Sequence, residues 1–564
     1  MKRFQYQAAV ILVMMLLLLP MGALAAKLTD VWVTGVMQNE EASDKLPIGA
    51  IHWWYSNKDK AYYLFLPAGA KAEELRIWFE GAQSITIDGK TLSSGDPASF
   101  LTPGAKATLT CDKSKYTLVV MQSKNIPALF ITTESGSLTS IHKSKNNQET
   151  GKMVMLNSDG TLSYDGALTQ FKCRGNSSFT YAKKPYQFKL EKSTDLAGMG
   201  KAKTWILLAD HEDNSLLRNK ITFALADAVG LDYSSQSQTV DVFLNNDYYG
   251  TYLLCEKVEI GGSRIDINNL EKDTGEVNEN PLNSYPAFGH KGYSLGQARG
   301  FQIPNDPEDI TGGYLLELEK INRYKNEANG FTTTRGQPVV IKEPEAASQA
   351  QAAYISAFMQ GFENAIFAED GIDPASGKHY SEFVDTDSLV KKYLIEEISK
   401  NFDGNRSSLF FYKPSDEQSL LAFAGPVWDY DNAYGNYSSQ RAESLKLPEY
   451  FAINKDNGER YYWYPALYKQ PDFYQAVVKI YHEEFVPALR VLLGLEESED
   501  GKLRSIDDFA AEIAPSAALN YTRWPVFNAK GRDVMTGRNY EENIAYLKKF
   551  LEGRLAFLSE NWIE

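Results

Sequence analysis

Hydrophobic and polar residues alternate in short runs between residues 28 and 135. The runs include AYYLFLP, ELRIWFEG, SITIDGKTL, YTLVVMQ and ALFITT. Alternation with a period of two is typical of half-buried strands. The pair Asp88-Gly89, between SITI and KTL, is a hairpin signal because both residues tolerate positive φ. Several short strands at this spacing predict an immunoglobulin-like β-sandwich over residues 28–135.

The pattern changes over residues 136–345, where strands continue and a helix joins them. KPYQFKL and KTWILLA are strand-like, whereas apolar residues recur at helical spacing in NSLLRNKITFALADAVG. A hairpin is expected in VDVFLNNDYYGTY, with its turn at Asn246-Asp247. Segment 271–311 is polar, contains glycine and proline and has no period, which predicts a long, mobile surface insertion.

Residues 346–564 are mostly helical by the same criterion. Apolar residues recur three and four positions apart in AYISAFMQGFENAIF and DSLVKKYLIEEISKNF, and only SSLFFYK and LLAFAGPVW have strand character. A β-rich region that precedes a helical one predicts an α+β fold in which a β-sandwich is followed by two lobes, a β-rich lobe at 136–345 and a mostly helical lobe at 346–564.

The first 26 residues have the composition of a secretory signal peptide. Lys2 and Arg3 precede a long apolar run, and small residues follow at 23–26. The alternative is a retained membrane anchor, because the apolar run approaches the ~20 residues that a span needs. We therefore expect a secreted or cell-surface protein, whose only membrane contact is this segment if it is retained.

Composition narrows the possible functions. The three cysteines of the 564-residue chain are too few for a disulfide framework, and their spacing is not that of a metal site. The formal net charge of −15 is unsuited to nonspecific nucleic-acid binding, which needs a basic surface. No nucleic-acid partner is expected.

Three aspartates are expected to meet at the ends of two short strands in the helical region. Asp403 lies in a polar loop before SSLFFYK, and Asp429 and Asp431 follow the returning strand in PVWDYD. Because an antiparallel hairpin brings its two ends together, the three carboxylates should be neighbours. Such carboxylates repel unless a cation neutralises them, and Mg²⁺ or Mn²⁺ suits these ligands. Alternatively, Asp429 caps a turn and Asp431 is solvated.

A second cluster is basic and lies in FKCRGNSSFTYAKKPYQFKL. It begins with a turn made of Arg174, Gly175, Asn176, Ser177 and Ser178. Backbone N–H groups of such a turn can point at an anion, and Lys189, on the face of its strand opposite Tyr186 and Phe188, could touch a phosphate. Alternatively, the lysines are solvated and protect a strand edge. Glu256 and Glu317 each follow an apolar strand and could pair with a cleft lysine, or could be ordinary exposed strand ends.

Five blocks of the sequence, in this order, together resemble the spore coat protein H (CotH) kinase family. They are RGNSS…KKPYQFKL, KTWILLAD…DNSLLRNK, VFLNNDYYGTYLLCEKV, NFDGNRSSLFFYK and PVWDYDNAYG, within roughly residues 136–440. The resemblance implies an atypical, secretory-type protein kinase that uses ATP and a divalent metal to phosphorylate Ser or Thr of proteins. It also implies that Asp403 is the catalytic-loop acid and that Asp429 is a catalytic metal ligand with Asp431 beside it. The turn at 174–178 would cover the phosphates, and Lys184, in the family motif, or Lys189 would contact them.

The chain departs from the usual kinase pattern five residues after Asp403, where kinases often place a metal-binding Asn and this chain has Ser408. A serine hydroxyl is a weaker ligand than an amide carbonyl, which leaves one or two metals open. The expected function is a kinase that acts on extracellular, envelope or spore-coat proteins. The alternatives are a catalytically weak relative that binds a partner or builds a surface structure, and a carbohydrate enzyme with Asp403 and Asp429 as an acid/base pair.

Overall fold

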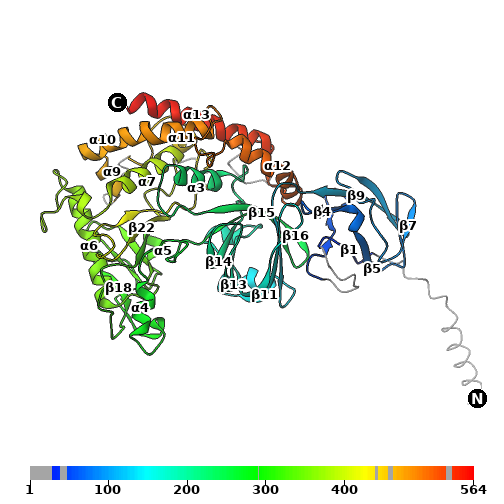
Figure 1. Cartoon of the computed structure of the whole chain (residues 1–564), viewed down its shortest axis with the longest axis horizontal. Helices are drawn as coiled ribbons and strands as arrows, with labels where there is room; N and C mark the ends of the chain where they lie inside the picture. Colours follow the sequence, from blue (N-terminus) through cyan, green and yellow to red (C-terminus); the bar gives the residue numbers. More distant parts are fainter. Residues whose placement is uncertain are drawn as a thin grey trace, which may run out of the picture. The chain divides into compact units, whose positions relative to one another are not determined.

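The structure is a computed structural model that describes residues 28–37, 47–289, 291–437, 443–454, 462–528 and 537–563 (Figure 1). The expected signal peptide at 1–26 lies outside the described residues. The chain forms two compact units. The first consists of Met1–Thr132, Val154–Leu162 and Asp241–Tyr249, and the second of Thr133–Met153, Ser163–Val240 and Gly250–Glu564. Within the ranges above, no helix is both long and apolar enough to cross a membrane.

The described part of the first unit contains a sheet with the strand order β2-β1-β5 and another with the order β3-β4-β9-β8-β6-β7. The strands are β1 (Asp30–Thr34), β2 (Ile51–His52), β3 (Trp54–Ser56), β4 (Ala61–Leu66), β5 (Arg76–Glu80), β6 (Ile85–Ile87), β7 (Lys90–Leu92), β8 (Lys106–Cys111) and β9 (Ser114–Gln122). The hairpin expected at Asp88-Gly89 is confirmed, since β6 and β7 pair around these residues with φ of 46° and 83°. The parallel pairing of β4 with β9 is not visible in the local pattern.

In the described part of the chain, the next strands close into a barrel with the order β10-β11-β12-β13-β14-β16-β15. They are β10 (Ala128–Thr133), β11 (Glu149–Leu156), β12 (Leu162–Cys173), β13 (Tyr186–Asp195), β14 (Lys201–Leu208), β15 (Ser237–Leu244) and β16 (Asp247–Glu256), with helix α2 (Thr139–Lys143) after β10. Alternation is clear in β13, where Tyr186 and Phe188 are buried and Lys189 is exposed. The turn expected at Asn246-Asp247 is wrong by one residue. Asn245 and Asn246 form it, with φ of 48° and 70°, because asparagine tolerates positive φ at both positions.

The helix expected in NSLLRNKITFALADAVG is confirmed as α3 (Arg218–Ala228). It begins later than the apolar spacing suggests, because Asp213 accepts hydrogen bonds from the backbone N–H groups of Ser215 and Arg218 and organises the preceding residues as a loop. Leu216 in this loop has a φ of 58°. Helix α3 therefore begins only after a tight, polar loop and does not extend back into it.

The second compact unit also contains, among described residues, a sheet with the order β17-β18-β20-β21-β19-β22-β23. Its strands are β17 (Ala287–Phe288), β18 (Ala298–Phe301), β19 (Tyr314–Leu318), β20 (Gly330–Thr332), β21 (Pro338–Glu343), β22 (Leu409–Lys413) and β23 (Phe423–Ala424), with short helices α4 (Leu270–Glu276) and α5 (Ile321–Tyr324). Segment 271–311 is thus not the irregular insertion that its composition predicts. Its strands are too short to show a period, and the buried Arg299 anchors it by donating to the carbonyls of Tyr324 and Glu327.

The expected helical region is confirmed (Figure 1). Its helices are α6 (Gln349–Phe367), α7 (Thr386–Ser399), α8 (Glu443–Lys446), α9 (Trp463–Leu467), α10 (Pro471–Ile480), α11 (Val486–Leu492), α12 (Ile506–Arg523) and α13 (Tyr540–Asn561). Helix α7 is central, because it contacts α3, α10, α13 and β23. Every residue of α7 from Ser388 to Ser399 is buried. The loop that follows α7 is therefore held by a fixed scaffold.

Candidate functional site

A cavity of about 560 Å³ in the second unit, here called the cleft, brings together most of the residues predicted for the site. Those that line it are Arg174, Gly175, Asn176, Ser177, Ser178, Glu317, Asp403, Ser408, Asp429 and Asp431. They come from the turn after β12, from β19, from the loop after α7 and from the segment after β23. Residues more than 250 positions apart in the sequence therefore meet at one surface.

Asp403 lies in a compact turn after α7. Helix α7 ends at Ser399 and is followed by Lys400, whose φ is 47°. The carbonyl of Asp403 accepts hydrogen bonds from the N–H groups of Arg406 and Ser407 at 2.7 and 3.1 Å. The carboxylate accepts a hydrogen bond from Lys320 Nζ at 2.5 Å. Burial raises the pKa of Asp403 above its ordinary value, although Lys320 acts to lower it. The turn and the ion pair hold this acid in one orientation.

Asp429 and Ser408 face each other across the base of the β22–β23 hairpin. Gly425 N–H donates to the Phe410 carbonyl at 2.9 Å, so the returning strand ends beside the start of β22. Ser408 Oγ then donates to Asp429 Oδ2 at 3.2 Å. Both residues have positive φ, 57° for Ser408 and 71° for Asp429. A positive φ costs a non-glycine residue of order 1 kcal/mol, and such residues concentrate at functional sites. Two of them in contact therefore indicate a functional site.

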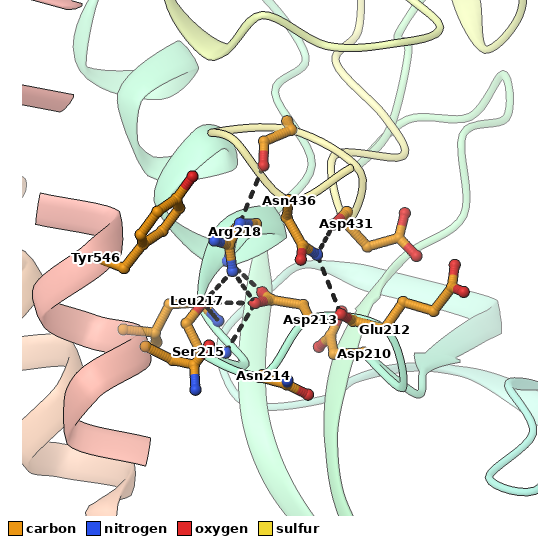
Figure 2. Close-up of polar contacts among 12 residues, drawn as sticks. Asp210, Glu212, Asp213, Asn214, Ser215, Leu217, Arg218, Asp431, Asn436 and Tyr546 are labelled. Atoms are coloured by element: carbon orange, nitrogen blue, oxygen red, sulfur yellow. Dashed lines mark hydrogen bonds and ion pairs between the residues drawn. The ribbon is translucent and has the colours of Figure 1, made fainter. Parts of the chain in front are cut away.

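Asp431 lies close to Asp429 on its own segment and to Glu212 and Asp210 on the loop after β14, and Figure 2 shows the latter two. Loss of hydration raises the pKa of Asp431 well above its usual range. Repulsion from Asp429, Glu212 and Asp210 raises it further, and Asp429 is within hydrogen-bonding reach. Two carboxylates can approach this closely only with a proton or a cation to offset their repulsion.

The oxygen donors of Asp429, Asp431 and Ser408 fit a hard divalent cation. Mg²⁺ commonly binds one or two carboxylates and completes its shell with water and phosphate oxygens. Asp403 does not complete an all-protein set, because its carboxylate is paired with Lys320. Among the residues that the structure describes, no three His, Cys, Asp or Glu side chains form a ligand group on their own. The expectation that three carboxylates converge on one point is therefore corrected: all three line the cleft and Asp429 lies near both of the others, but among the described residues the three do not form one ligand group.

The turn at 174–178 is shaped by Gly175 and packed on an aromatic side chain. Gly175 has a φ of 84°, and a Cβ there would lie 2.1 Å from Ser178 Oγ. The Arg174 guanidinium lies over the Trp428 ring, 5.2 Å from its centroid. Trp428 immediately precedes Asp429, so this contact joins the turn to the acidic segment. The arrangement can present a guanidinium and backbone N–H groups to an anion in the cleft.

Neither predicted lysine lines the cleft. Lys184 Nζ donates to the carbonyls of Phe179 and Tyr181, at 2.6 and 3.1 Å, and so supports the turn. Lys189 is exposed on β13 and lines a different cavity, of about 700 Å³. The lysines that line the cleft are Lys145, Lys172, Lys257 and Lys342, and of these Lys342 on β21 pairs with Glu317.

The two predicted glutamates have different surroundings. Glu317 and Lys342 lie on adjacent strands, and their side chains pair at 3.1 Å within the cleft. Burial acts to lower the pKa of Lys342, but Glu317 outweighs it and keeps that pKa above its ordinary value. Glu256 instead pairs with Arg264 at 2.5 Å and lies outside the cleft. The expected pairing with a cleft lysine therefore holds for Glu317 alone of the two.

Sequence reasoning missed two residues that line the cleft, Lys342 and Asp210, and also missed Lys320, which pairs with Asp403. Lys342 had a usable signal, because it directly follows the apolar run VVI within one strand. Lys320 had none, since its partner Asp403 is 83 residues away. Asp210 lies in the block KTWILLAD that carries the family resemblance, and burial, followed by repulsion from Asp213, raises its pKa to about 7.

The comparisons with known proteins agree with the placement of the cleft. No curated protein matches the chain. The sequence model of the family described as CotH kinase protein matches residues 171–558, which is more than half of the chain. That range includes the turn at 174–178, the Glu317–Lys342 pair and all three cleft aspartates of the β22–β23 region. By this match the chain belongs to the CotH kinase protein family.

Proposed function

We propose that the protein is an exported, ATP- and metal-dependent kinase that phosphorylates Ser or Thr of extracellular, envelope or spore-coat proteins. The observation that carries the proposal is that the turn at 174–178, the Lys342–Glu317 pair and the acids Asp403, Asp429 and Asp431 line one cavity. Phosphoryl transfer needs these parts, because charge spreads over the transferring group while the attacking and leaving oxygens stay in line. The β-rich and helical parts of the matched region would form the two lobes of an atypical kinase.

Each group has a proposed task. Asp429 and Asp431, with the Ser408 hydroxyl, would hold Mg²⁺ or Mn²⁺, which when bound neutralises phosphate charge. Lys342, oriented by Glu317, and the turn at 174–178 would bind the phosphates of ATP. Asp403 would accept a hydrogen bond from the hydroxyl of the substrate and orient it, because Lys320 restricts the carboxylate to one position. Export rests on the composition of residues 1–26.

The proposed activity is tested first with the wild-type protein. We expect ATP together with Mg²⁺ or Mn²⁺ to raise its melting temperature, because ligands that bind the folded state stabilise it. ATP with a chelator should give a smaller increase. The same protein should then transfer labelled γ-phosphate to a serine-rich acceptor protein. A metal-dependent shift without transfer would favour the second candidate, a catalytically weak binding protein. The presence of Ser408 where kinases often have a metal-binding asparagine also favours that candidate.

The choice of phosphate-binding lysine makes a second prediction. Lys342→Met should lower kcat/KM for ATP by about a hundredfold, because it removes a charged donor from the cleft and leaves Glu317 unpaired. The matched control is Lys189→Met, which changes an exposed lysine of a neighbouring sheet outside the cleft and should leave kcat/KM unchanged. Steady-state kinetics at saturating acceptor measures both. A large loss for Lys189→Met and none for Lys342→Met would reverse the assignment.

A further inference from the structure

Residues 430–436, which carry Asp431 and follow Asp429, are held by side chains that do not belong to the acidic set. Asn436 is buried, and its Nδ2 donates to two backbone carbonyls, that of Asp431 at 2.6 Å and that of Glu212 at 3.0 Å (Figure 2). These carbonyls lie on different loops, one after β23 and one after β14. A single amide therefore joins the two acid-bearing loops.

The first residue of α3 makes a second connection to the same segment. Arg218 Nε donates to the carbonyl of Ala433 at 3.0 Å, and its Nη1 pairs with Asp213 (Figure 2). Both side chains of this ion pair are fully buried. Asp213 also accepts hydrogen bonds from the N–H groups of Ser215 and Arg218, so its own loop is fixed. Arg218 thus ties residue 433 to the start of α3.

The second residue of α3 makes the third connection. Asn219 Oδ1 accepts from the N–H of Tyr430 at 2.8 Å, which lies between Asp429 and Asp431. Its Nδ2 donates to Asp210 Oδ1 at 2.9 Å. Backbone groups of residues 430, 431 and 433 are therefore each held by a buried side chain, on both sides of the Asp431 carboxylate.

We propose that Asn436, together with Arg218 and Asn219, is a positioning residue that fixes the backbone around Asp431 and so sets the affinity of the cleft for a divalent cation. This inference rests on the proposed function. Carboxylates that repel one another spread apart unless their backbone is held, and a cation gains affinity when its ligands are already in place. Residues that orient metal ligands typically contribute tenfold to a hundredfold to metal affinity.

Asn436→Leu tests the proposal, because it removes both donors at similar side-chain volume and adds no charge. The matched control is Asn329→Leu. Asn329 is also buried, and its amide also bridges two backbone carbonyls, those of Ile341 and Pro344, but it does not line the cleft. Variants of Arg218 are avoided, because loss of a buried ion-pair partner leaves Asp213 uncompensated and threatens folding.

The probe is Mn²⁺ alone, without nucleotide, and its binding is followed by the paramagnetic resonance signal of free Mn²⁺. Asn436→Leu should raise the dissociation constant for Mn²⁺ roughly tenfold to a hundredfold over wild type, whereas Asn329→Leu should leave it unchanged. In the absence of metal, both variants should have a free energy of unfolding that is lower than that of wild type by a similar amount. If Asn436→Leu does not fold, Asn436→Ser, which keeps one donor, should give an intermediate constant.

Equal Mn²⁺ affinity in wild type and in a folded Asn436 variant would overturn the positioning role. Phosphate transfer by the wild type would then still support the proposed function. An equal loss of affinity in Asn329→Leu would also overturn it, because the effect would follow general destabilisation. Failure of the wild-type protein to bind Mn²⁺ would overturn both the positioning role and the proposed metal dependence.

Discussion

Asp429→Asn is expected to abolish phosphoryl transfer and to leave the fold intact. The substitution removes the charge that would hold the cation, and loss of such electrostatic stabilisation lowers kcat by about 1,000-fold, which corresponds to about 4 kcal/mol. Stability should change little, because Asp429 is exposed and asparagine accepts its positive φ as readily as aspartate does. Transfer of labelled phosphate and a thermal melt of the same preparation measure the two effects.

The chain offers a matched control for this substitution. Asp112 is also exposed and has a φ of 50°, but it lies in the turn between β8 and β9. Asp112→Asn should therefore change neither transfer nor melting temperature. A clear fall in the melting temperature of Asp429→Asn would assign Asp429 a structural role, and undiminished transfer would remove it from the metal site.

Arg554→Met should lower the free energy of unfolding by about 3–5 kcal/mol, the cost of leaving a buried charge without its partner. Arg554 on α13 pairs with Glu397 on α7 at 3.0 Å, and both side chains are fully buried. Arg554 Nη1 also donates to the carbonyls of Pro448 and Tyr450. The pair thus connects two helices to the segment at 443–454. Urea unfolding followed by tryptophan fluorescence measures the change.

An exposed ion pair provides the comparison for Arg554. Arg490 and Glu496 pair at the surface, with 42% and 45% of their side chains exposed. Arg490→Met should cost at most about 1 kcal/mol, because water solvates the remaining charge and screens the pair. Similar decreases in the free energy of unfolding for the two variants would mean that burial of the Arg554–Glu397 pair does not increase its contribution to stability.

Features that depend on neighbouring residues could be predicted from the sequence. The Asp88-Gly89 hairpin follows from two residues that tolerate positive φ, and α3 follows from apolar residues at helical spacing. The proximity of Asp403 to Asp429 followed in the same way, because a short hairpin necessarily returns near its start. The segment 271–311 was predicted poorly, since two-residue and four-residue strands have no detectable period.

The sequence by itself determined the local elements, the acids at the ends of one hairpin and the family of the chain. Only the tertiary structure decided which lysine side chains lie near the acids of the cleft. It chose Lys342 over Lys184 and Lys189 as the cleft lysine near Glu317, and it paired Lys320 with Asp403. It also brought Asn436 to the loop of Glu212. The physical reason is that contacts between residues tens to hundreds of positions apart depend on strand order and loop packing, which leave no repeating pattern in the chain.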